Sequence, residues 1–381
     1  MTQNRSQKVV VVGRGAAGSA ATATLLRSGW HGEVVVVDGE AGGGYNRTLV
    51  NKGILPGLLT SPQIALRPVE GVTEVLDRAI RIDVGQRMLR LESGTTLPFD
   101  ALILATGSRA RGWPGAVESA RVTALHSPDD AIRAAALLDG GSRSVTILGA
   151  GLVGAETASI LTERGIYVAL VARSTAPLAG VLGMEIAAQI RELHAEHVDT
   201  FFGQDVNAIE ADADSATVTL EGGHRLRSDV VIVAHGTRPD VDWIGGTAES
   251  LTTDRRLRWD AAARIYAAGG MAAYLTHDGS RLRVDHWEDA AAQGVHAAAV
   301  ALHDLGCGDD PGPYQSVAGY SLRLYGHTVT AFGVPLPGDH ETPAGRTGLV
   351  NQFEGAAGVS AVIGFDAVSV VRTVAGEVGL R

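Results

Sequence analysis

The first segment with a clear hydrophobic pattern, "KVVVVGRGAAGSAATATLLRSGWHGEVVVVD", begins at Lys8. Its β-branched run at residues 8–12 predicts a buried parallel strand, and the small residues from 16 to about 28 predict a helix. A second β-branched run, at residues 33–37, predicts another strand, which ends at Asp38. Three glycines separate the first strand from the helix at G-x-G-x-x-G spacing: Gly13, Gly15 and Gly18. This order predicts a β-α-β unit.

The same order recurs in "SRSVTILGAGLVGAETASILTERGIYVALVARS", residues 142–174. The pattern predicts a strand at residues 145–148, a helix that continues to residue 164, and a further strand at residues 167–171. The glycines again lie between strand and helix: Gly149, Gly151 and Gly154. The two units differ at the end of the second strand. Asp38 stands there in the first unit, whereas Ala172, followed by Arg173, stands there in the second.

Shorter patterns lie outside these two units. Residues 76–100 alternate and turn at Gly85 and Gly94, which predicts a small β-hairpin insert. The end of the chain contains three short strand candidates: "YSLRLYG", "TVTAFG" and "SAVIGFD". We therefore predict an α/β fold with two Rossmann-like dinucleotide-binding domains.

Each glycine of such a turn has a separate task. The first makes the tight turn, the second lets the backbone approach a pyrophosphate, and the third lets helix and strand pack closely. The helix N-terminus then offers N–H groups to the phosphates. Asp38, or its rival Glu40, can accept a ribose hydrogen bond in the first unit. In the second unit Arg173 favours NADPH over NADH, since it can pair with a 2′-phosphate; alternatively it is an exposed loop residue.

Composition removes several classes of function. The 381 residues carry a net charge of −10, which disfavours a nucleic-acid partner. The single cysteine, Cys307, excludes an internal disulfide, and the histidine spacing supports no metal site. No apolar run reaches membrane-spanning length, and the N-terminal residues lack the pattern of a signal peptide. We expect a cytoplasmic protein that does not bind membranes.

Three further motifs resemble those of the two-dinucleotide-binding-domain flavoproteins, the superfamily that includes glutathione reductase: "ALILATGSRAR", "VVIVAHGTRPD" and "RIYAAGG". The resemblance implies FAD at the first glycine turn and a nicotinamide dinucleotide at the second. It also implies a split FAD domain at residues 1–111 and 238–305. The NAD(P) domain would occupy residues 112–237, and a small C-terminal α/β domain, the interface domain of these proteins, would occupy residues 306–381.

Within this superfamily the chain most resembles the ferredoxin and rubredoxin reductase branch. "GYNRTLVNKGIL" matches that branch's signature at Tyr45, Arg47 and Lys52, and "RVDHWEDAAAQG" matches a later stretch through Asp285 and Trp287. The disulfide-reducing members, and the single-cysteine peroxidases and oxidases, need a cysteine near the first of these stretches, and none is present. The resemblance therefore implies that electrons leave the flavin directly.

Two departures from the branch stand out. Its late motif ends in Gly-Asp, whose aspartate bonds the FAD ribityl chain, whereas this chain has Gly270 there. Losing a charge-assisted hydrogen bond costs about 1.5–3 kcal/mol, or about one to two decades of affinity. A Trp-Ser-Asp-Gln block that opens the branch's C-terminal domain is also missing, which leaves the choice of electron acceptor open.

The resemblance assigns roles to individual residues. Lys52 lies by the flavin and pairs with Glu156, which is placed near the nicotinamide on the first turn of its helix, and Arg47 contacts FAD. Trp287 covers the flavin ring or packs between domains, and Tyr45 is structural. The expected catalytic residues are Lys52 and Glu156, with no metal. The expected cofactor-binding residues are Gly13, Gly15, Ala17, Gly18, Asp38, Glu40, Arg47, Lys52, Ala105, Thr106, Gly107, Gly149, Gly151, Val153, Gly154, Glu156, Arg173, Gly236, Gly269, Gly270 and Trp287.

Three functions agree with these patterns. The first is an NAD(P)H-dependent, FAD-containing reductase that passes electrons to a ferredoxin-type iron–sulfur partner. The second is an FAD-dependent NAD(P)H oxidase or reductase that acts on a small molecule or O2 without a protein partner. The third is a degenerate scaffold that binds nucleotide without catalysis, which the retention of Lys52 and Glu156 disfavours. A homodimer is possible in each case.

Overall fold

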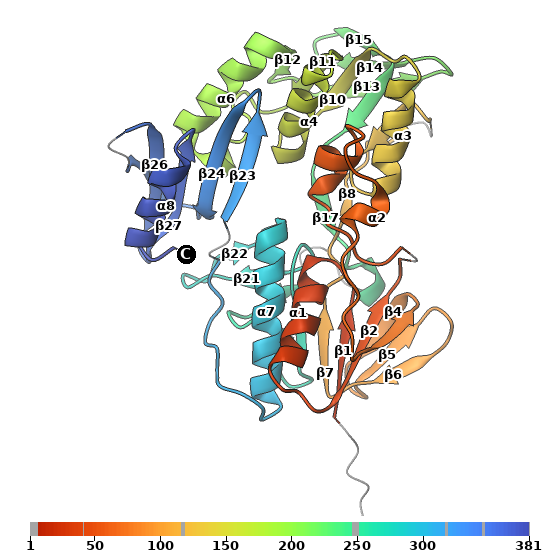
Figure 1. The fold of residues 1–381 in the computed structure, drawn as a ribbon, viewed down its shortest axis with the longest axis vertical. Helices are drawn as coiled ribbons and strands as arrows, with labels where there is room; N and C mark the ends of the chain where they lie inside the picture. Colours follow the sequence, from red (N-terminus) through yellow and green to blue (C-terminus); the bar gives the residue numbers. More distant parts are fainter. Residues whose placement is uncertain are drawn as a thin grey trace, which may run out of the picture. The chain divides into compact units, whose positions relative to one another are not determined.

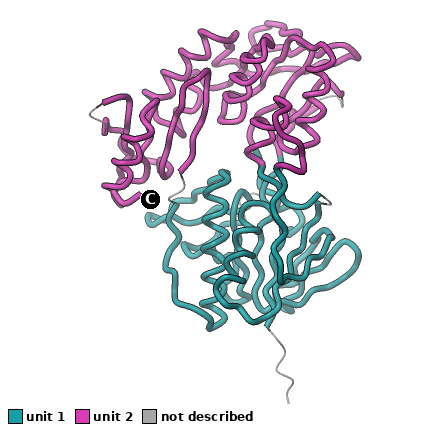
Figure 2. Tube along the Cα trace, viewed as in Figure 1, with its two compact units in different colours: residues 1–46, 64–109, 237–316 teal, residues 47–63, 110–236, 317–381 magenta. Residues whose placement is uncertain are grey.

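The computed structural model describes residues 7–40, 42–115, 119–245, 251–316, 319–344 and 347–380. The chain folds into two compact units (Figure 2). Unit 1 comprises residues 1–46, 64–109 and 237–316, and unit 2 comprises residues 47–63, 110–236 and 317–381. The segment 47–63 and the C-terminal segment both group with the second glycine turn, so the units differ from the three domains expected from sequence. The assignment of those three domains stays a prediction.

Unit 1 is built on a six-stranded sheet (Figure 1). Five of its strands run parallel, and the edge strand β19 pairs antiparallel with β20. The sheet order is β19 (Arg258–Asp260), β20 (Ile265–Ala267), β7 (Ala101–Leu104), β1 (Lys8–Val12), β2 (Glu33–Asp38) and β3 (Thr73–Leu76). The first β-α-β unit was predicted to within a residue, since helix α1 spans Ala16–Arg27.

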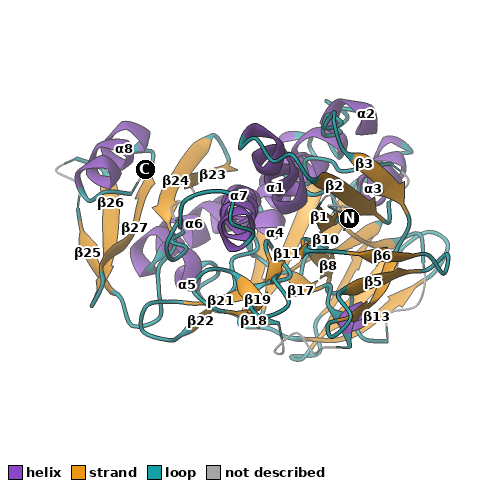
Figure 3. Ribbon diagram, turned by 90° about the horizontal axis from the view of Figure 1, so that it is seen from below, coloured by secondary structure: helices purple, strands orange, loops and turns teal. Residues whose placement is uncertain are grey.

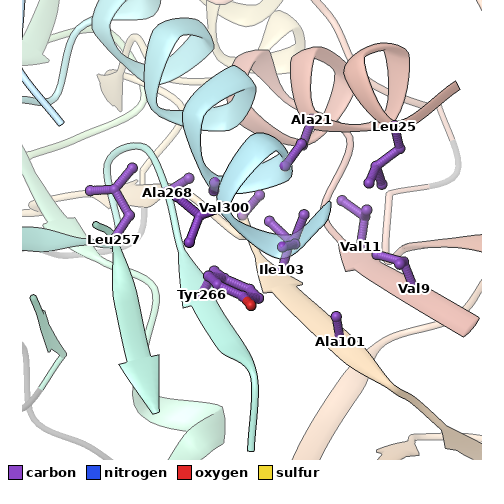
Figure 4. Packing of buried hydrophobic residues seen from close by; sticks show 14 of the residues in the cluster. Val9, Val11, Ala21, Leu25, Ala101, Ile103, Leu257, Tyr266, Ala268 and Val300 are labelled. Atoms are coloured by element: carbon purple, nitrogen blue, oxygen red, sulfur yellow. The ribbon is translucent and has the colours of Figure 1, made fainter. Parts of the chain in front are cut away.

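Both faces of this sheet are covered, which explains the unbroken apolar run of β1. Val9 and Val11 pack with Ala21 and Leu25 of α1 on one face (Figure 4). The alternate residues pack against Leu89 and the other apolar residues of a second cluster on the opposite face. A strand buried on both faces cannot alternate apolar and polar residues.

Helix α7 (Trp287–Asp304) packs beside α1 in this unit. Gly294 makes the close approach possible, because a Cβ there would lie 2.1 Å from the carbonyl oxygen of Ala17. A side chain at position 294 would force the two helices apart. Ala17 therefore has a packing role in addition to any contact with a cofactor.

The predicted hairpin insert is a three-stranded antiparallel sheet. Its strands are β4 (Ala79–Asp83), β5 (Met88–Leu91) and β6 (Thr96–Pro98). The remaining elements of unit 1 are short: β8 (Ser108–Ala110), β17 (Thr237–Pro239), η2 (Asp242–Ile244), β18 (Thr252–Thr253), β21 (Ala273–Leu275) and β22 (Arg281–Leu282). Strands β8 and β17 pair with each other where the chain leaves unit 1 and returns to it.

Unit 2 contains a five-stranded parallel sheet with the second glycine turn. Its order is β12 (Asp199–Phe202), β11 (Tyr167–Ala172), β10 (Ser144–Leu148), β16 (Val230–Val233) and β9 (Val122–Ala124). Its helices are η1 (Val50–Ile54), α3 (Pro128–Asp139), α4 (Leu152–Glu163), α5 (Ala179–Leu182) and α6 (Met184–His197); the short α2 (Ser61–Ile64) lies at the unit boundary. A second three-stranded insert, which we did not predict, consists of β13 (Val206–Ala211), β14 (Ala216–Leu220) and β15 (Arg225–Ser228).

The C-terminal segment forms a five-stranded antiparallel sheet covered by α8 (Val368–Glu377) (Figures 1 and 3). Three strands coincide with the predicted candidates: β23 (Gly319–Leu324), β24 (His327–Gly333) and β27 (Gly358–Phe365). Two were missed: β25 (His340–Pro343) and β26 (Leu349–Gly355). Leu322 and Val329 of this sheet share a core with Ala155 of α4. Over the ranges described above, no helix has the length and apolarity needed to cross a membrane.

Candidate functional site

In the first glycine turn, close contacts with backbone carbonyl oxygens exclude a side chain at two of the three glycines. Gly13 has a φ of +100°, and a Cβ on it would lie 2.3 Å from the carbonyl oxygen of Ala105. A Cβ on Gly18 would lie 1.9 Å from the carbonyl oxygen of Gly13. Gly15 differs, because among the described residues, apart from its chain neighbours, no atom lies within 4 Å of its Cβ position. Its lack of a side chain keeps open a space that the protein does not fill.

The second glycine turn has the same geometry. Gly149 has a φ of +111°, and a Cβ there would lie 2.3 Å from the carbonyl oxygen of Ala234. A Cβ on Gly154 would lie 1.9 Å from the carbonyl oxygen of Gly149, whereas Gly151 again faces open space. Each turn thus keeps one open position at the start of a helix.

The helix ends beside these open positions carry no side-chain cap. Gly15 caps α1 and Gly151 caps α4, and neither first turn contains an acidic residue. Helix α3 shows the alternative, since Ser127 and Asp130 form a reciprocal capping box there. The uncapped N–H groups of α1 and α4, with the open space above them, fit the pyrophosphates of two dinucleotides.

Sheet order brings most of the predicted cofactor residues together within each unit. In parallel α/β sheets, ligands bind beyond the carboxyl ends of the strands. In unit 1 these ends belong to the adjacent strands β20, β7, β1 and β2. Residues predicted for the cofactor follow them in turn: Gly269 and Gly270 after β20, Ala105, Thr106 and Gly107 after β7, Gly13, Gly15, Ala17 and Gly18 after β1, and Asp38 and Glu40 at and beyond the end of β2.

Unit 2 repeats this arrangement on three adjacent strands. The predicted residues follow β10 (Gly149, Gly151, Val153, Gly154 and Glu156), β11 (Arg173) and β16 (Gly236). Val153 is 44% exposed although it lies in a helix that is otherwise largely buried. An exposed apolar residue beside an open turn is compatible with a ligand contact.

Asp38 has an acceptor atom that the protein does not use. Its Oδ1 accepts a hydrogen bond from the backbone N–H of Glu40 at 3.2 Å. Its Oδ2 is buried and finds no partner among the described residues. Burial raises the pKa of Asp38, against the Glu40 hydrogen bond and the Arg14 cation, which lower it. The unused oxygen fits the hydroxyl donors of a ribose, while the side chain of Glu40 is exposed.

Ala172 occupies the position in unit 2 that Asp38 occupies in unit 1. Val37 pairs with the last residue of β1, and Val171 pairs with the last residue of β10, so the next residue has the same place in each sheet. Arg173 is exposed at the end of β11. Burial lowers the pKa of His235, as does the Arg173 cation, against the Asp205 carboxylate, which raises it.

Two further residues of unit 2, His235 and Trp113, were not predicted for this site. Their rings make an edge contact with centroids 5.9 Å apart. His235 directly follows Ala234, whose carbonyl oxygen closes the second glycine turn. A search for aromatic or basic residues after β16 would have found His235, whereas the contact with Trp113 depends on the fold.

Lys52 and Glu156 form an ion pair within unit 2. Lys52 Nζ lies 3.0 Å from Glu156 Oε1, and the side chains are 37% and 8% exposed. The same oxygen accepts a hydrogen bond from the backbone N–H of Arg323 at 3.2 Å. Glu156 lies on the second turn of α4, about 7 Å along the axis from Gly151, which corrects the expected first-turn position. The pair joins η1, α4 and β23, so distant segments of the chain build it.

Burial raises the pKa of Glu156 above its ordinary value of 4.5, against Lys52, the Arg323 amide and Asn51, which lower it. The native protein therefore holds the Glu156 proton more tightly than the unfolded chain. Stability from this group is complete below about pH 4.5 and is lost as the pH rises through the raised pKa.

We expect Glu156→Gln to remove this pH dependence. The free energy of unfolding of the variant should exceed that of the natural chain by more at about pH 8 than at about pH 4, because glutamine has no carboxylate to desolvate. Urea denaturation at the two pH values measures the difference. Glu163→Gln, at the end of the same helix, is the control; an equal response in both variants would contradict the assignment to Glu156.

Other predicted residues have protein contacts. Arg47 is half-buried, and its Nη1 donates a hydrogen bond to the carbonyl oxygen of His126 at 2.5 Å. Tyr45 pairs with Ala65 through an isolated bridge in unit 1. Trp287 is half-buried as the first residue of α7. Their contacts with a cofactor stay predictions. In the described part of the chain, no group of three or more His, Cys, Asp or Glu residues could hold a metal ion.

Residues 7–294 match the family profile described as pyridine nucleotide-disulphide oxidoreductase. The chain belongs to this family. It is therefore an FAD-dependent oxidoreductase that uses a pyridine nucleotide, and the family predicted from the glycine turns and later motifs is confirmed. The match covers both glycine turns and stops within α7.

Similar curated proteins lie in the predicted branch. The chain is 25% identical over 348 residues to the biphenyl dioxygenase system ferredoxin–NAD(+) reductase component of Paraburkholderia xenovorans, covering 88% of this chain and 84% of that protein. It is 28% identical over 332 residues to the chlorobenzene dioxygenase ferredoxin reductase component of a Cupriavidus species, covering 84% and 80%.

Solved structures confirm the fold class. The putidaredoxin reductase–putidaredoxin complex matches with a TM-score of 0.87 at 22% identity, covering 99% of this chain and 94% of that chain. A ferredoxin reductase from Rhodopseudomonas palustris matches with a TM-score of 0.83 at 24% identity, covering 94% and 91%. At these identities the likeness establishes the architecture alone.

Proposed function

We propose that this protein is a ferredoxin reductase, which takes electrons from a reduced nicotinamide dinucleotide and passes them through FAD to a ferredoxin-type iron–sulfur protein. The observation that carries the proposal is the ion pair between Lys52 of η1 and Glu156 of α4, the helix that starts at the second glycine turn. Support comes from the single cysteine, the exposed Cys307, which leaves no redox-active disulfide as an intermediate carrier. The similar curated proteins named above are reductase components of dioxygenase systems.

The proposal assigns one cofactor to each glycine turn. FAD binds at the first, through the α1 N-terminus and the unused oxygen of Asp38, and the nicotinamide dinucleotide binds at the second. A flavin held at the first turn would supply the step from two-electron to one-electron transfer: it would take two electrons and a proton as hydride from the nicotinamide, pass the electrons one at a time to the iron–sulfur partner, and give up the proton to solvent. The protein orients the two rings and supplies the charges around them.

Lys52 and Glu156 act on charge and protons at this site. The Lys52 ammonium stabilises the negative charge that develops on the flavin during reduction, and Glu156 holds the ammonium in place. Glu156 also lies near the nicotinamide in this proposal. Its raised pKa lets its carboxyl group hold a proton there. Arg47 and Trp287 contact FAD in this proposal.

Cytochrome c reduction tests the partner. With NADPH or NADH and the purified protein, we expect reduction only after a ferredoxin is added, in proportion to its concentration. An equal rate without ferredoxin would favour the alternative, a reductase or oxidase of a small molecule or O2. A protein that binds no flavin would contradict both functions and favour the nucleotide-binding scaffold.

We also propose NADPH as the donor, because Ala172 stands where the ribose-binding carboxylate is expected and Arg173 follows it beyond β11. Arg173→Ala should raise KM for NADPH about 10-fold to 100-fold and leave KM for NADH nearly unchanged. Steady-state kinetics with both nucleotides measures the ratio. Arg143→Ala is a matched control, since Arg143 is exposed at the opposite end of β10. Equal effects on both nucleotides would contradict the role of Arg173.

Two further expectations stay predictions. The chain is expected to act in the cytoplasm, and a homodimer is one candidate for its assembly.

A further inference from the structure

The space that a side chain at Gly270 would fill is occupied by the carboxylate of Asp285. A Cβ built on Gly270 would lie 2.2 Å from Asp285 Oδ1 and 3.3 Å from Ser108 Oγ. The φ of Gly270 is not in the left-handed region, so the backbone there would accept an ordinary residue. The carboxylate of Asp285, rather than the backbone, is what excludes a side chain at position 270.

Asp285 is held by one of its two carboxylate oxygens. Oδ2 accepts hydrogen bonds from Ser108 Oγ at 2.9 Å, from Arg283 Nη2 at 2.9 Å and from Thr237 Oγ1. The hydrogen bonds of Asp285 to the described residues all use this oxygen. Oδ1 is therefore left facing Gly270, and the side chain is 30% exposed. A ligand donor can reach Oδ1 without breaking a protein contact.

The turn beside Asp285 is fixed on both sides. The N–H of Gly269 donates to Gln293 Oε1 at 2.8 Å, and Gln293 is fully buried. Arg283 Nε donates to the carbonyl oxygen of Gly270 at 2.7 Å. Arg283 thus binds both the turn and Asp285, which fixes the carboxylate relative to Gly270.

The sheet order places this carboxylate at the edge with the first glycine turn. Ser108 follows β7 and Gly270 follows β20, and β7 pairs with both β20 and β1. The carboxyl ends of these three strands meet where a dinucleotide binds in such sheets. Oδ1 of Asp285 is an unused, charged acceptor at that edge.

We propose that Asp285 supplies the flavin-binding carboxylate that the chain lacks at Gly270, with Oδ1 accepting a hydrogen bond from a hydroxyl of the ribityl chain of FAD. This inference rests on the proposed function, since it requires FAD in unit 1. The acceptor has moved from the end of β20 to the segment before α7. The glycine at 270 and the aspartate at 285 depend on each other, because a side chain at position 270 and the carboxylate of Asp285 would occupy the same space.

FAD affinity of the apoprotein tests the inference without relying on activity. Asp285→Asn keeps the shape of the side chain but removes its charge, and we expect the Kd for FAD, measured by fluorescence quenching, to rise about 10-fold to 100-fold. Asp83→Asn, in the separate β4 sheet, is the matched control and should leave the Kd unchanged. An unchanged Kd in Asp285→Asn would overturn the inference.

A reciprocal exchange guards against misfolding of the single variant. Gly270→Asp alone brings two carboxylates together and should weaken FAD binding. Combined with Asp285→Gly, it moves the acceptor back to position 270, and the Kd should return to within about 3-fold of the natural chain. A double variant as weak as the worse single variant would contradict the exchange. If the natural chain itself binds no FAD, the proposed function fails; if it binds FAD and Asp285→Asn binds equally well, only the role of Asp285 fails.

Discussion

Gly15→Val is expected to give a folded protein without FAD, and Gly151→Val a yellow protein that NADPH no longer reduces. Both positions have backbone angles that valine accepts, with φ of −72° at Gly15 and −76° at Gly151. In the part of the chain that the structure describes, no atom beyond the chain neighbours lies within 4 Å of either Cβ position. The new side chains therefore disturb the open spaces and leave the packing around them intact.

The expected losses are large because a valine prevents close approach of a pyrophosphate to the helix N-terminus. FAD affinity in Gly15→Val, and the rate of flavin reduction in Gly151→Val, should each fall by about 100-fold or more, which corresponds to about 2.7 kcal/mol. Flavin absorbance after purification, and then anaerobic titration with NADPH, measure both effects.

Each variant is the control for the other. If Gly151→Val loses FAD while Gly15→Val retains it, the assignment of the two turns is reversed. Gly18→Ala is unsuitable for this purpose, because its Cβ would lie 1.9 Å from the carbonyl oxygen of Gly13 and would perturb the fold itself.

Lys52→Met is expected to slow flavin reduction by NADPH about 100-fold while FAD stays bound. The variant removes the cation that stabilises charge on the reduced flavin, and loss of one such preorganised group typically costs a factor of about 100 or more. It also removes one influence that lowers the pKa of Glu156, so that carboxyl should hold its proton to higher pH. Anaerobic stopped-flow measurements over a range of pH record both effects.

The chain provides a closely matched control in Lys8, its only other lysine. Lys8 Nζ lies 3.0 Å from Glu33 Oε2, as Lys52 lies from Glu156, but this pair joins β1 and β2 at their amino ends. Lys8→Met should cost at most about 1 kcal/mol of stability and leave the reduction rate unchanged. A similar loss of rate in both variants would show that Lys52 acts through the fold.

Local sequence determined both β-α-β units. The bounds of β1, α1 and β2 agree with the pattern to within a residue, because their apolar runs and glycines specify the structure over short distances. The local pattern did not predict β25, whose residues "HETP" show no alternation of apolar and polar positions. This edge strand takes its conformation from pairing with its neighbour β26. The insert of β13, β14 and β15 was missed, although its β14 alternates buried and half-buried residues.

The family could be predicted because part of the steric demand at each glycine turn is local. Gly18 lies against the carbonyl oxygen of Gly13, and Gly154 lies against that of Gly149, which leaves a readable spacing in the sequence. The close approaches of Gly13 to Ala105 and of Gly149 to Ala234 join distant segments and leave no such spacing. Which side chains meet depends on the tertiary structure. It groups residues 47–63 with the second glycine turn and sets Asp285 into the space that Gly270 leaves, neither of which was predicted. It also confirms the pairing of Lys52 with Glu156, which the resemblance had implied but no local pattern encodes. Contacts between distant segments depend on strand order and helix packing, which no local pattern encodes.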